Sequence, residues 1–261
     1  MSRKFLSGKY GKSLLFWMCM CLCLALPALA SVISTKQEIQ IGRSSSAQIE
    51  KKYGLVNDPA LCGKIEALGR KLAANSQRDK ISYSFKVLNQ DVVNAFAFPG
   101  GFVYVTKGIC KVMNLNQLSF VMGHEITHVE KRHSVKGIER NVMGQMGGSL
   151  LVSLLGGGSR KQMNTLVNMT NFVVNNHYSQ DQEREADEGG MELMSAAGFD
   201  PQYAVEALEV LKKNDSGKGD SQFMNSLLSS HPLTKERIES ANGRVADLRK
   251  RYGLQAGASG F

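Results

Sequence analysis

Apolar residues recur every three or four positions between Leu115 and Val129, and this periodicity predicts an amphipathic helix. The spacing is carried by Leu115, Leu118, Val121, Met122, Ile126 and Val129. Charged residues follow directly at positions 130–132, as expected where a helix ends. The polar positions of this helix hold two of the five histidines of the chain.

Strands are predicted just before this helix. Apolar and polar residues alternate from position 81 to position 87, which is typical of a half-buried strand. Residues 92–98 and 102–106 follow as two further strands on either side of a Pro-Gly-Gly turn. Together they predict a small antiparallel or mixed sheet beside the central helix.

Helices account for most of the remaining chain. Thr35 and Glu38 match a capping box that opens a helix running toward Tyr53. Residues 214–220 are a polar linker. Further helix starts and stops are marked by Asp58-Pro59, Gly198 and Asp200-Pro201. The predicted fold class is therefore α+β and mainly helical.

His124, Glu125 and His128 form an HExxH motif on the central helix. Positions i and i+4 differ by about 40° of rotation and one turn of rise, so both imidazoles can share one metal ion. Glu125 lies about 100° round from His124, too far for a third ligand but near enough to reach a water molecule in the open metal position. The motif predicts two zinc ligands and a general base; the alternative is two surface histidines on an ordinary helix.

His133 is not expected to bind the metal. On a continuous helix it lies about 180° from His124 and faces away from the metal. The metzincin pattern would also require glycine and histidine where this chain has Lys131 and Ser134. We therefore expect His133 to be a helix-end histidine.

The third metal ligand is expected from the acidic run at residues 179–187. Glu183 and Asp187 are again i and i+4, so one helix face can offer Glu183 to the metal and Asp187 to the free N–H of a ligand imidazole. The alternative is a solvated acidic face, which an isolated run of this kind usually forms. Paired with HExxH, Glu183 is favoured as a ligand of one Zn²⁺ per chain.

These motifs resemble those of the gluzincin metallopeptidases that include HtpX, the CAAX prenyl proteases and the BepA-like periplasmic enzymes. The stretches of that family occur in order at residues 94–106, 123–129 and 183–187, and then at His231-Pro232 with Arg237. Gln180 departs from the family pattern, which usually has arginine there. The resemblance implies a zincin-type catalytic domain, with Asn94, Ala95 and Phe96 as a substrate-binding edge strand; a plain core strand is the alternative.

His231 and Arg237 are hypothesised to lie in the same cleft. A positive side chain near the reacting carbonyl stabilises its oxyanion, which makes His231 a candidate catalytic residue and Arg237 an oxyanion candidate. Alternatively, His231 swings onto the metal and silences the enzyme. A histidine before a proline at a helix start is also often only structural.

Residues 1–30 predict an export signal, because basic residues precede an apolar run that ends in Ala-Leu-Ala. An uncleaved membrane anchor is the alternative. Cleavage leaves residues 31–261, predicted to be a single zinc metallopeptidase domain, and lowers the formal charge from +9 to +5. That charge suits peripheral contact with an anionic membrane but lacks the basic stripe of a nucleic-acid binder, so no nucleic acid is expected.

Two cysteines and one glycine-rich segment each allow two interpretations. Cys62 and Cys110 either form a disulfide in an oxidising compartment or stay buried thiols. Residues 141–159, which carry no charge, either cover the domain or act as a lid or membrane contact.

The sequence as a whole predicts a zinc-dependent endopeptidase of the bacterial cell envelope. The resemblance implies a periplasmic location and unfolded or misfolded envelope proteins as substrates. The alternative function is a chaperone-like assembly factor that binds unfolded chains with little proteolysis. Cleavage of an unfolded model protein distinguishes the two.

Overall fold

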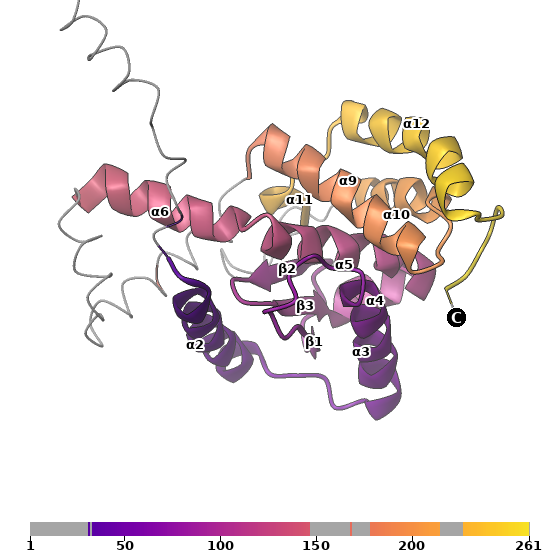
Figure 1. Cartoon of the computed structure of the whole chain (residues 1–261). Coiled ribbons are helices and arrows are strands. Elements are labelled where there is room, and N and C mark those ends of the chain that lie inside the picture. Colours follow the sequence, from indigo (N-terminus) through magenta and orange to yellow (C-terminus); the bar gives the residue numbers. More distant parts are fainter. Residues whose placement is uncertain (1–30, 32, 147–167, 169–177, 215–226, 261) are drawn as a thin grey trace, which may run out of the picture. The chain divides into compact units, whose positions relative to one another are not determined.

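Helix α2 (Thr35–Tyr53) opens the computed structural model, which describes residues 31, 33–146, 168, 178–214 and 227–260 (Figure 1). Its cap is Ser34, whose hydroxyl accepts a hydrogen bond from the Gln37 amide while the Gln37 side chain accepts one from the Ser34 amide. The capping box predicted at Thr35 and Glu38 was therefore placed one residue too late. Glu38 is fully buried instead.

The Glu38 carboxylate ties α2 to three other segments. Arg78 donates to it from Nη1 and Nη2 at 2.7 and 3.1 Å. Arg132 Nε lies 3.0 Å away as an ion pair, and the Gly100 amide donates at 3.2 Å. A carboxylate taken out of water requires partners of this kind. They fix α2 against the Pro-Gly-Gly turn and against the end of the HExxH helix.

Helix α3 (Pro59–Ala73) begins where the sequence predicted. The Asp58 carboxylate accepts hydrogen bonds from the Ala60 and Leu61 amides, both at 3.0 Å. The buried face of α3, which includes Ile65 and Leu68, packs against strand β1. An Asp cap followed by Pro at the first helical position is what a stable helix start needs.

Strands β1 (Ser84–Leu88), β2 (Ala95–Phe98) and β3 (Phe102–Thr106) form a mixed sheet in the order β1-β3-β2. β1 runs parallel to β3, and β2 runs antiparallel to it. The small mixed sheet is confirmed, although β1 begins three residues later than the alternation predicted. In the described sheet β2 is an edge strand, and it packs against the HExxH helix.

Helix α5 (Leu115–Glu130) carries the HExxH motif and matches its predicted range. Short helix α4 (Lys107–Val112) connects it to β3. Asn114 and Gln117 form a reciprocal capping box at its start. All residues from 118 to 129 are buried, so α5 lies inside the fold with the sheet on one side and other helices around it.

Helix α9 (Gln180–Ala196) runs along α5 and makes the most extensive helix contact of the described chain (Figure 1). The two backbones meet at Gly123 and Gly190. A Cβ atom on Gly190 would lie 2.8 Å from the His124 amide nitrogen, which is too close for any side chain. This contact without side chains lets the carboxylates of α9 reach the imidazoles of α5.

The C-terminal part is helical, as predicted. Helix α10 (Gln202–Lys213) packs on α5, and α12 (Lys235–Tyr252) packs on α9 and α10. Short α11 (Leu227–Ser230) precedes His231. Buried Asp200 accepts hydrogen bonds from Arg249 Nε and Nη2, both at 2.8 Å, and from the Gly257 amide. This carboxylate therefore holds the residues after α12 against the start of α10.

Several predictions fall on parts of the chain that the structure does not describe. The export signal at 1–30, most of the glycine-rich segment at 141–159 and most of the linker at 214–220 lie outside the described residues. Cys62 and Cys110 are free thiols, and burial raises the pKa of Cys110 to about 11. Among the described helices, none is long and apolar enough to cross a bilayer.

Candidate metal centre

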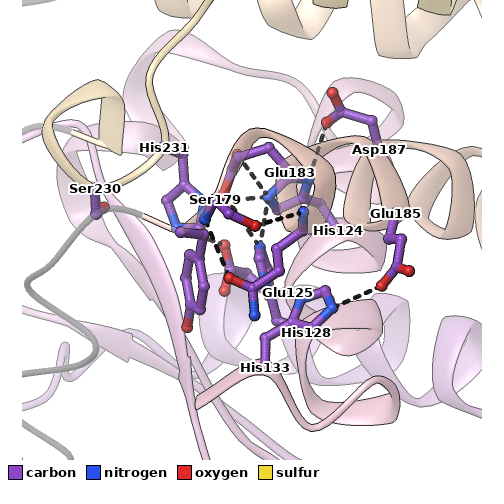
Figure 2. A network of polar contacts seen from close by, with 12 residues as sticks. His124, Glu125, His128, His133, Ser179, Glu183, Glu185, Asp187, Ser230 and His231 are labelled. Atoms are coloured by element: carbon purple, nitrogen blue, oxygen red, sulfur yellow. Dashed lines mark hydrogen bonds and ion pairs between the residues drawn. The ribbon is translucent and has the colours of Figure 1, made fainter. Parts of the chain in front are cut away.

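Four buried side chains converge between α5 and α9 (Figure 2). His124, His128, Glu183 and His231 each offer one donor atom, and these atoms lie within 4.8 Å of one another. The Nε2 atoms of His124 and His128 are 3.0 Å apart, and the carboxylate oxygens of Glu183 lie 3.7 and 3.6 Å from them. Imidazole nitrogens and a carboxylate form a donor set that suits zinc.

Two unpaired carboxylate oxygens at the centre are evidence for a cation-binding site. Glu125 Oε1 and Glu183 Oε2 are buried and have no hydrogen-bond partner among the described residues. Arg237 Nη1 lies 2.9 Å from Glu183 Oε2, but without hydrogen-bond geometry. Since buried polar atoms are normally paired, these orphan oxygens fit a site built for a metal ion.

The surroundings also set the charges of the donors. Burial lowers the pKa of His128 well below its ordinary value of 6.5, which keeps the imidazole neutral as a metal ligand requires. Burial acts to raise the pKa of Glu183, but the charges of His231, His124 and Arg237 outweigh burial and lower it. Glu183 is therefore held as a carboxylate facing the imidazoles.

Glu125 lies at the edge of the donor set, next to the sheet. Its side chain is buried, and this burial raises its pKa above the ordinary value. Its Oε1 lies 3.7 Å from His231 Nε2, and the backbone of Ala97 in β2 acts to lower the pKa of Glu125. The outer edge of β2 therefore faces the centre.

Asp187 lies behind His124, one turn along α9 from Glu183. His124 Nδ1 is 3.0 Å from Asp187 Oδ1, the contact that the i, i+4 spacing predicted. Arg237 holds Asp187 from the other side, with Nε and Nη2 at 2.7 and 2.8 Å from the two carboxylate oxygens. Burial acts to raise the pKa of Asp187, but the hydrogen bonds from His124 and Arg237 outweigh it and lower the pKa.

Arg237 also donates to the backbone carbonyls of His231 and Pro232, at 3.3 and 3.0 Å. It therefore links the loop before α12 to α9. Its guanidinium nitrogens are directed at Asp187, Glu183 and this loop. An oxyanion role for Arg237 stays a prediction.

His231 lies closer to the donor atoms than a residue at the rim of a cleft would. Its Nδ1 is 2.8 Å from Glu183 Oε1 and 3.2 Å from His124 Nε2. Burial acts to lower the pKa of His231, but the carboxylates of Glu183 and Glu125 outweigh burial and raise it. A ring nitrogen of His231 thus lies within 4.8 Å of the donor atoms of His124, His128 and Glu183.

The predicted substrate-binding residues lie at and just before β2. Asn94, Ala95 and Phe96 are all buried, and Phe96 packs against Phe98 and Tyr104 in a small core cluster. Their side chains therefore fill the interior, and the Asn94 amide and carbonyl are both hydrogen-bonded to Thr106. A substrate contact by these three residues stays a prediction. Asn94 Oδ1 is buried without a hydrogen-bond partner among the described residues.

The prediction for His133 is wrong about where the ring points. Helix α5 ends at Glu130, Arg132 adopts a left-handed φ of 57°, and α6 (His133–Met146) begins a new direction. The 180° argument assumed one continuous helix and does not apply. His133 Nδ1 lies 2.8 Å from His128 Nδ1, so the ring faces the centre from behind a ligand.

Tyr178 is a contact that the sequence did not reveal. Its ring stacks on His128 with centroids 4.0 Å apart, and its hydroxyl forms a 2.9 Å hydrogen bond with Ser134. It directly precedes Ser179, the cap of α9. No periodicity or motif marks it, because the contact depends on how α9 enters the fold.

This fold and site define a metallopeptidase: an HExxH helix beside a small sheet, with a second helix that places a buried carboxylate next to the two imidazoles. The sequence model of Peptidase family M48 matches residues 59–245, more than half of the chain. The chain therefore belongs to peptidase family M48, which confirms the resemblance to the gluzincin metallopeptidases.

Named relatives agree with this family. The beta-barrel assembly-enhancing protease of Escherichia coli O157:H7 is 33% identical over 229 residues, which cover 84% of this chain and 46% of the relative. Metalloprotease YcaL of Escherichia coli K12 is 27% identical over 218 residues, 83% of each chain. Metalloprotease LoiP of the same strain is 32% identical over 165 residues, 62% of this chain and 63% of the relative. The chain spans about half the length of the first of these relatives.

Proposed function

We propose that this chain is a zinc-dependent endopeptidase of the bacterial cell envelope that degrades misfolded or stalled envelope proteins in the periplasm. The observation that carries the proposal is the buried Glu125 beside the donor atoms of His124, His128 and Glu183. A zinc ion bound there lowers the pKa of water and polarises a substrate carbonyl. The names of the bacterial relatives support an envelope role.

Each side chain has a separate task in this proposal. His124, His128 and Glu183 hold the zinc ion, and Asp187 fixes the orientation of His124. Glu125 Oε1 takes the proton of the attacking water and delivers it to the leaving amine. The raised pKa of Glu125, caused by burial, suits a group that must both accept and release this proton near neutral pH.

The proposed substrate is an extended stretch of an unfolded chain. The outer edge of β2 faces the centre through Ala97, and a backbone edge pairs with any peptide that can extend along it. A small pocket touches His124 and His231 and is lined by Phe120, Leu208, Leu211 and Leu227. Extended segments exposed by misfolding fit such an edge, whereas the pocket, at about 10 Å³, has room for about one water molecule.

A chaperone-like assembly factor with little proteolysis is the second candidate. The observation in its favour is His231, whose Nδ1 lies within hydrogen-bond distance of Glu183 and His124. A fourth protein donor would take the place that catalysis needs for water. The name of the assembly-enhancing protease is consistent with a role in assembly.

Cleavage of casein by the purified chain separates these candidates. Glu125→Gln should keep its zinc and lose about 10²–10⁴-fold in turnover, because the amide cannot accept the proton. Glu183→Ala should lose zinc. Exposed Glu66→Gln is the matched control and should leave both unchanged. Cleavage by Glu125→Gln at the rate of the parent chain would mean that the base is misassigned.

His231→Ala tests latency in the same assay. Faster cleavage indicates that His231 blocks the centre, and slower cleavage indicates a catalytic role. Unchanged kinetics would remove His231 from the mechanism. Recovery of the protein from periplasmic rather than cytoplasmic extracts tests the proposed location.

A further inference from the structure

The two imidazoles of the HExxH motif are supported differently from behind. His124 turns Nδ1 to a carboxylate, Asp187, at 3.0 Å. The Nδ1 atom of His128 instead faces another imidazole, with the Nδ1 atom of His133 at 2.8 Å (Figure 2). The far nitrogen of His133, Nε2, lies 3.0 Å from Glu185 Oε2. Three groups therefore stand in line from the centre to the surface.

Only one arrangement of protons along His128, His133 and Glu185 allows His128 to bind a metal ion through Nε2. His128 Nε2 faces His124 Nε2 and Glu183, so it must present a lone pair and the proton must sit on Nδ1. That proton needs an acceptor, which His133 supplies with the lone pair of its own Nδ1. His133 then carries its proton on Nε2 and donates it to the Glu185 carboxylate.

The fold builds the line from three elements. The left-handed turn at Arg132 starts α6 at His133 and brings its ring back against α5. Helix α9 supplies Glu185 two residues after Glu183, so one helix serves both the centre and its support. The His133 side chain is fully buried, whereas the Glu185 side chain is 54% exposed.

We propose that His133 and Glu185 form a positioning pair that fixes the tautomer and orientation of His128 as an Nε2 metal ligand. Neither residue contacts the metal or substrate. The pair does for His128 what Asp187 does for His124, through one additional imidazole. The proposal rests on the metal site of the proposed function, but not on its peptidase activity.

Zinc affinity, measured by competition with a fluorescent chelator, tests the pair without any substrate. His133→Phe keeps a flat ring but removes the acceptor, and it should weaken zinc binding about 10–100-fold, as loss of such outer partners does. His133→Gln keeps an amide oxygen that accepts and an N–H that donates, and it should recover most of that loss. Equal weakening in both variants would reduce His133 to a packing role and overturn the proposal.

Glu185→Ala keeps the test decisive if His133→Phe does not fold, because Glu185 is half-exposed. It should weaken zinc binding several-fold. The matched control is Asp181→Ala, which removes an 85% exposed acid from the same helix and should change nothing. If Glu185→Ala binds zinc as tightly as Asp181→Ala, Glu185 does not support His128 and the pair is wrong.

Two spectroscopic readings report positioning directly. Long-range ¹H–¹⁵N spectra of the zinc-loaded chain should show His128 protonated at Nδ1 and His133 protonated at Nε2. The ligand-field bands of the cobalt-substituted protein should shift in His133→Phe and return in His133→Gln. A His133 protonated at Nδ1 would overturn the proposal, whatever the Glu125 variant does in the cleavage assay.

Discussion

Neutralising Glu38 is the sharpest test of whether buried charge pairs hold α2 against the HExxH helix α5. Glu38→Gln keeps the size of the side chain but removes its charge. It leaves Arg78 and Arg132, whose side chains are only 15% and 22% exposed, without their counter-ion. Breaking one partner out of a buried ion pair costs about 3–5 kcal/mol.

We expect the lower end of this range, about 3 kcal/mol, because both arginines keep some access to water. For a domain of this size the loss corresponds to a fall of about 6–12 °C in Tm. The free energy of unfolding is measured by urea titration at pH 7 on metal-free protein, so that zinc binding does not contribute. Thermal unfolding gives Tm on the same samples.

Glu66→Gln is the matched control for this charge removal. Glu66 pairs with Arg70 one turn away on α3, and the two side chains are 49% and 72% exposed. Exposed pairs of this kind contribute about 0.3–0.5 kcal/mol. A loss below about 1 kcal/mol in Glu38→Gln, or one equal to that of the control, would refute the argument that buried charge compensation anchors α2.

Three further outcomes follow from the packing and the metal site. In urea titrations, Gly190→Ala should lower the free energy of unfolding by about 1–3 kcal/mol, because the added Cβ would press on the His124 backbone. Gly63→Ala is the control: its Cβ would have no atom within 4 Å, and the variant should raise the free energy of unfolding by about 0.5–1 kcal/mol. Burial acts to raise the pKa of Asp200, but the hydrogen bond from Arg249 outweighs burial and lowers the pKa below its ordinary value of 3.8. The free energy of unfolding should therefore exceed that of Asp200→Asn by a constant amount above about pH 5, and this difference should shrink as the pH falls below 3.8. A difference that grows toward low pH would contradict this. Chelating zinc should lower Tm, and zinc at 100 times its Kd should restore about 2.7 kcal/mol of stability; equal Tm values would contradict a folded-state site.

Local patterns were sufficient for the elements that carry the chemistry. The apolar spacing from Leu115 to Val129 predicted α5 nearly to the residue, because a helix that must bury one face repeats its apolar side chains every three or four positions. The i, i+4 spacing of Glu183 and Asp187 likewise predicted that the two carboxylates would meet the centre together. Both properties belong to a single helix and need no knowledge of its neighbours.

Contacts between different helices and strands could be predicted from the sequence only where a motif indicated them. His133 was misjudged because the turn at Arg132 has a left-handed φ that no glycine announces. Ser34 caps α2 in place of Thr35, because Glu38, the expected partner of Thr35, pairs with Arg78, 40 residues away. Such choices depend on which charges become buried together.

The sequence by itself therefore determined the HExxH helix, the second acidic helix and three of the four converging side chains, His124, His128 and Glu183. The tertiary structure decided what surrounds them: His231 beside Glu183, Arg237 clamped on Asp187, and His133 behind His128. The physical reason is that periodicity fixes the face of a helix, whereas turn angles and helix crossings are fixed by long-range packing. Here, the contact of Gly123 with Gly190 sets that crossing.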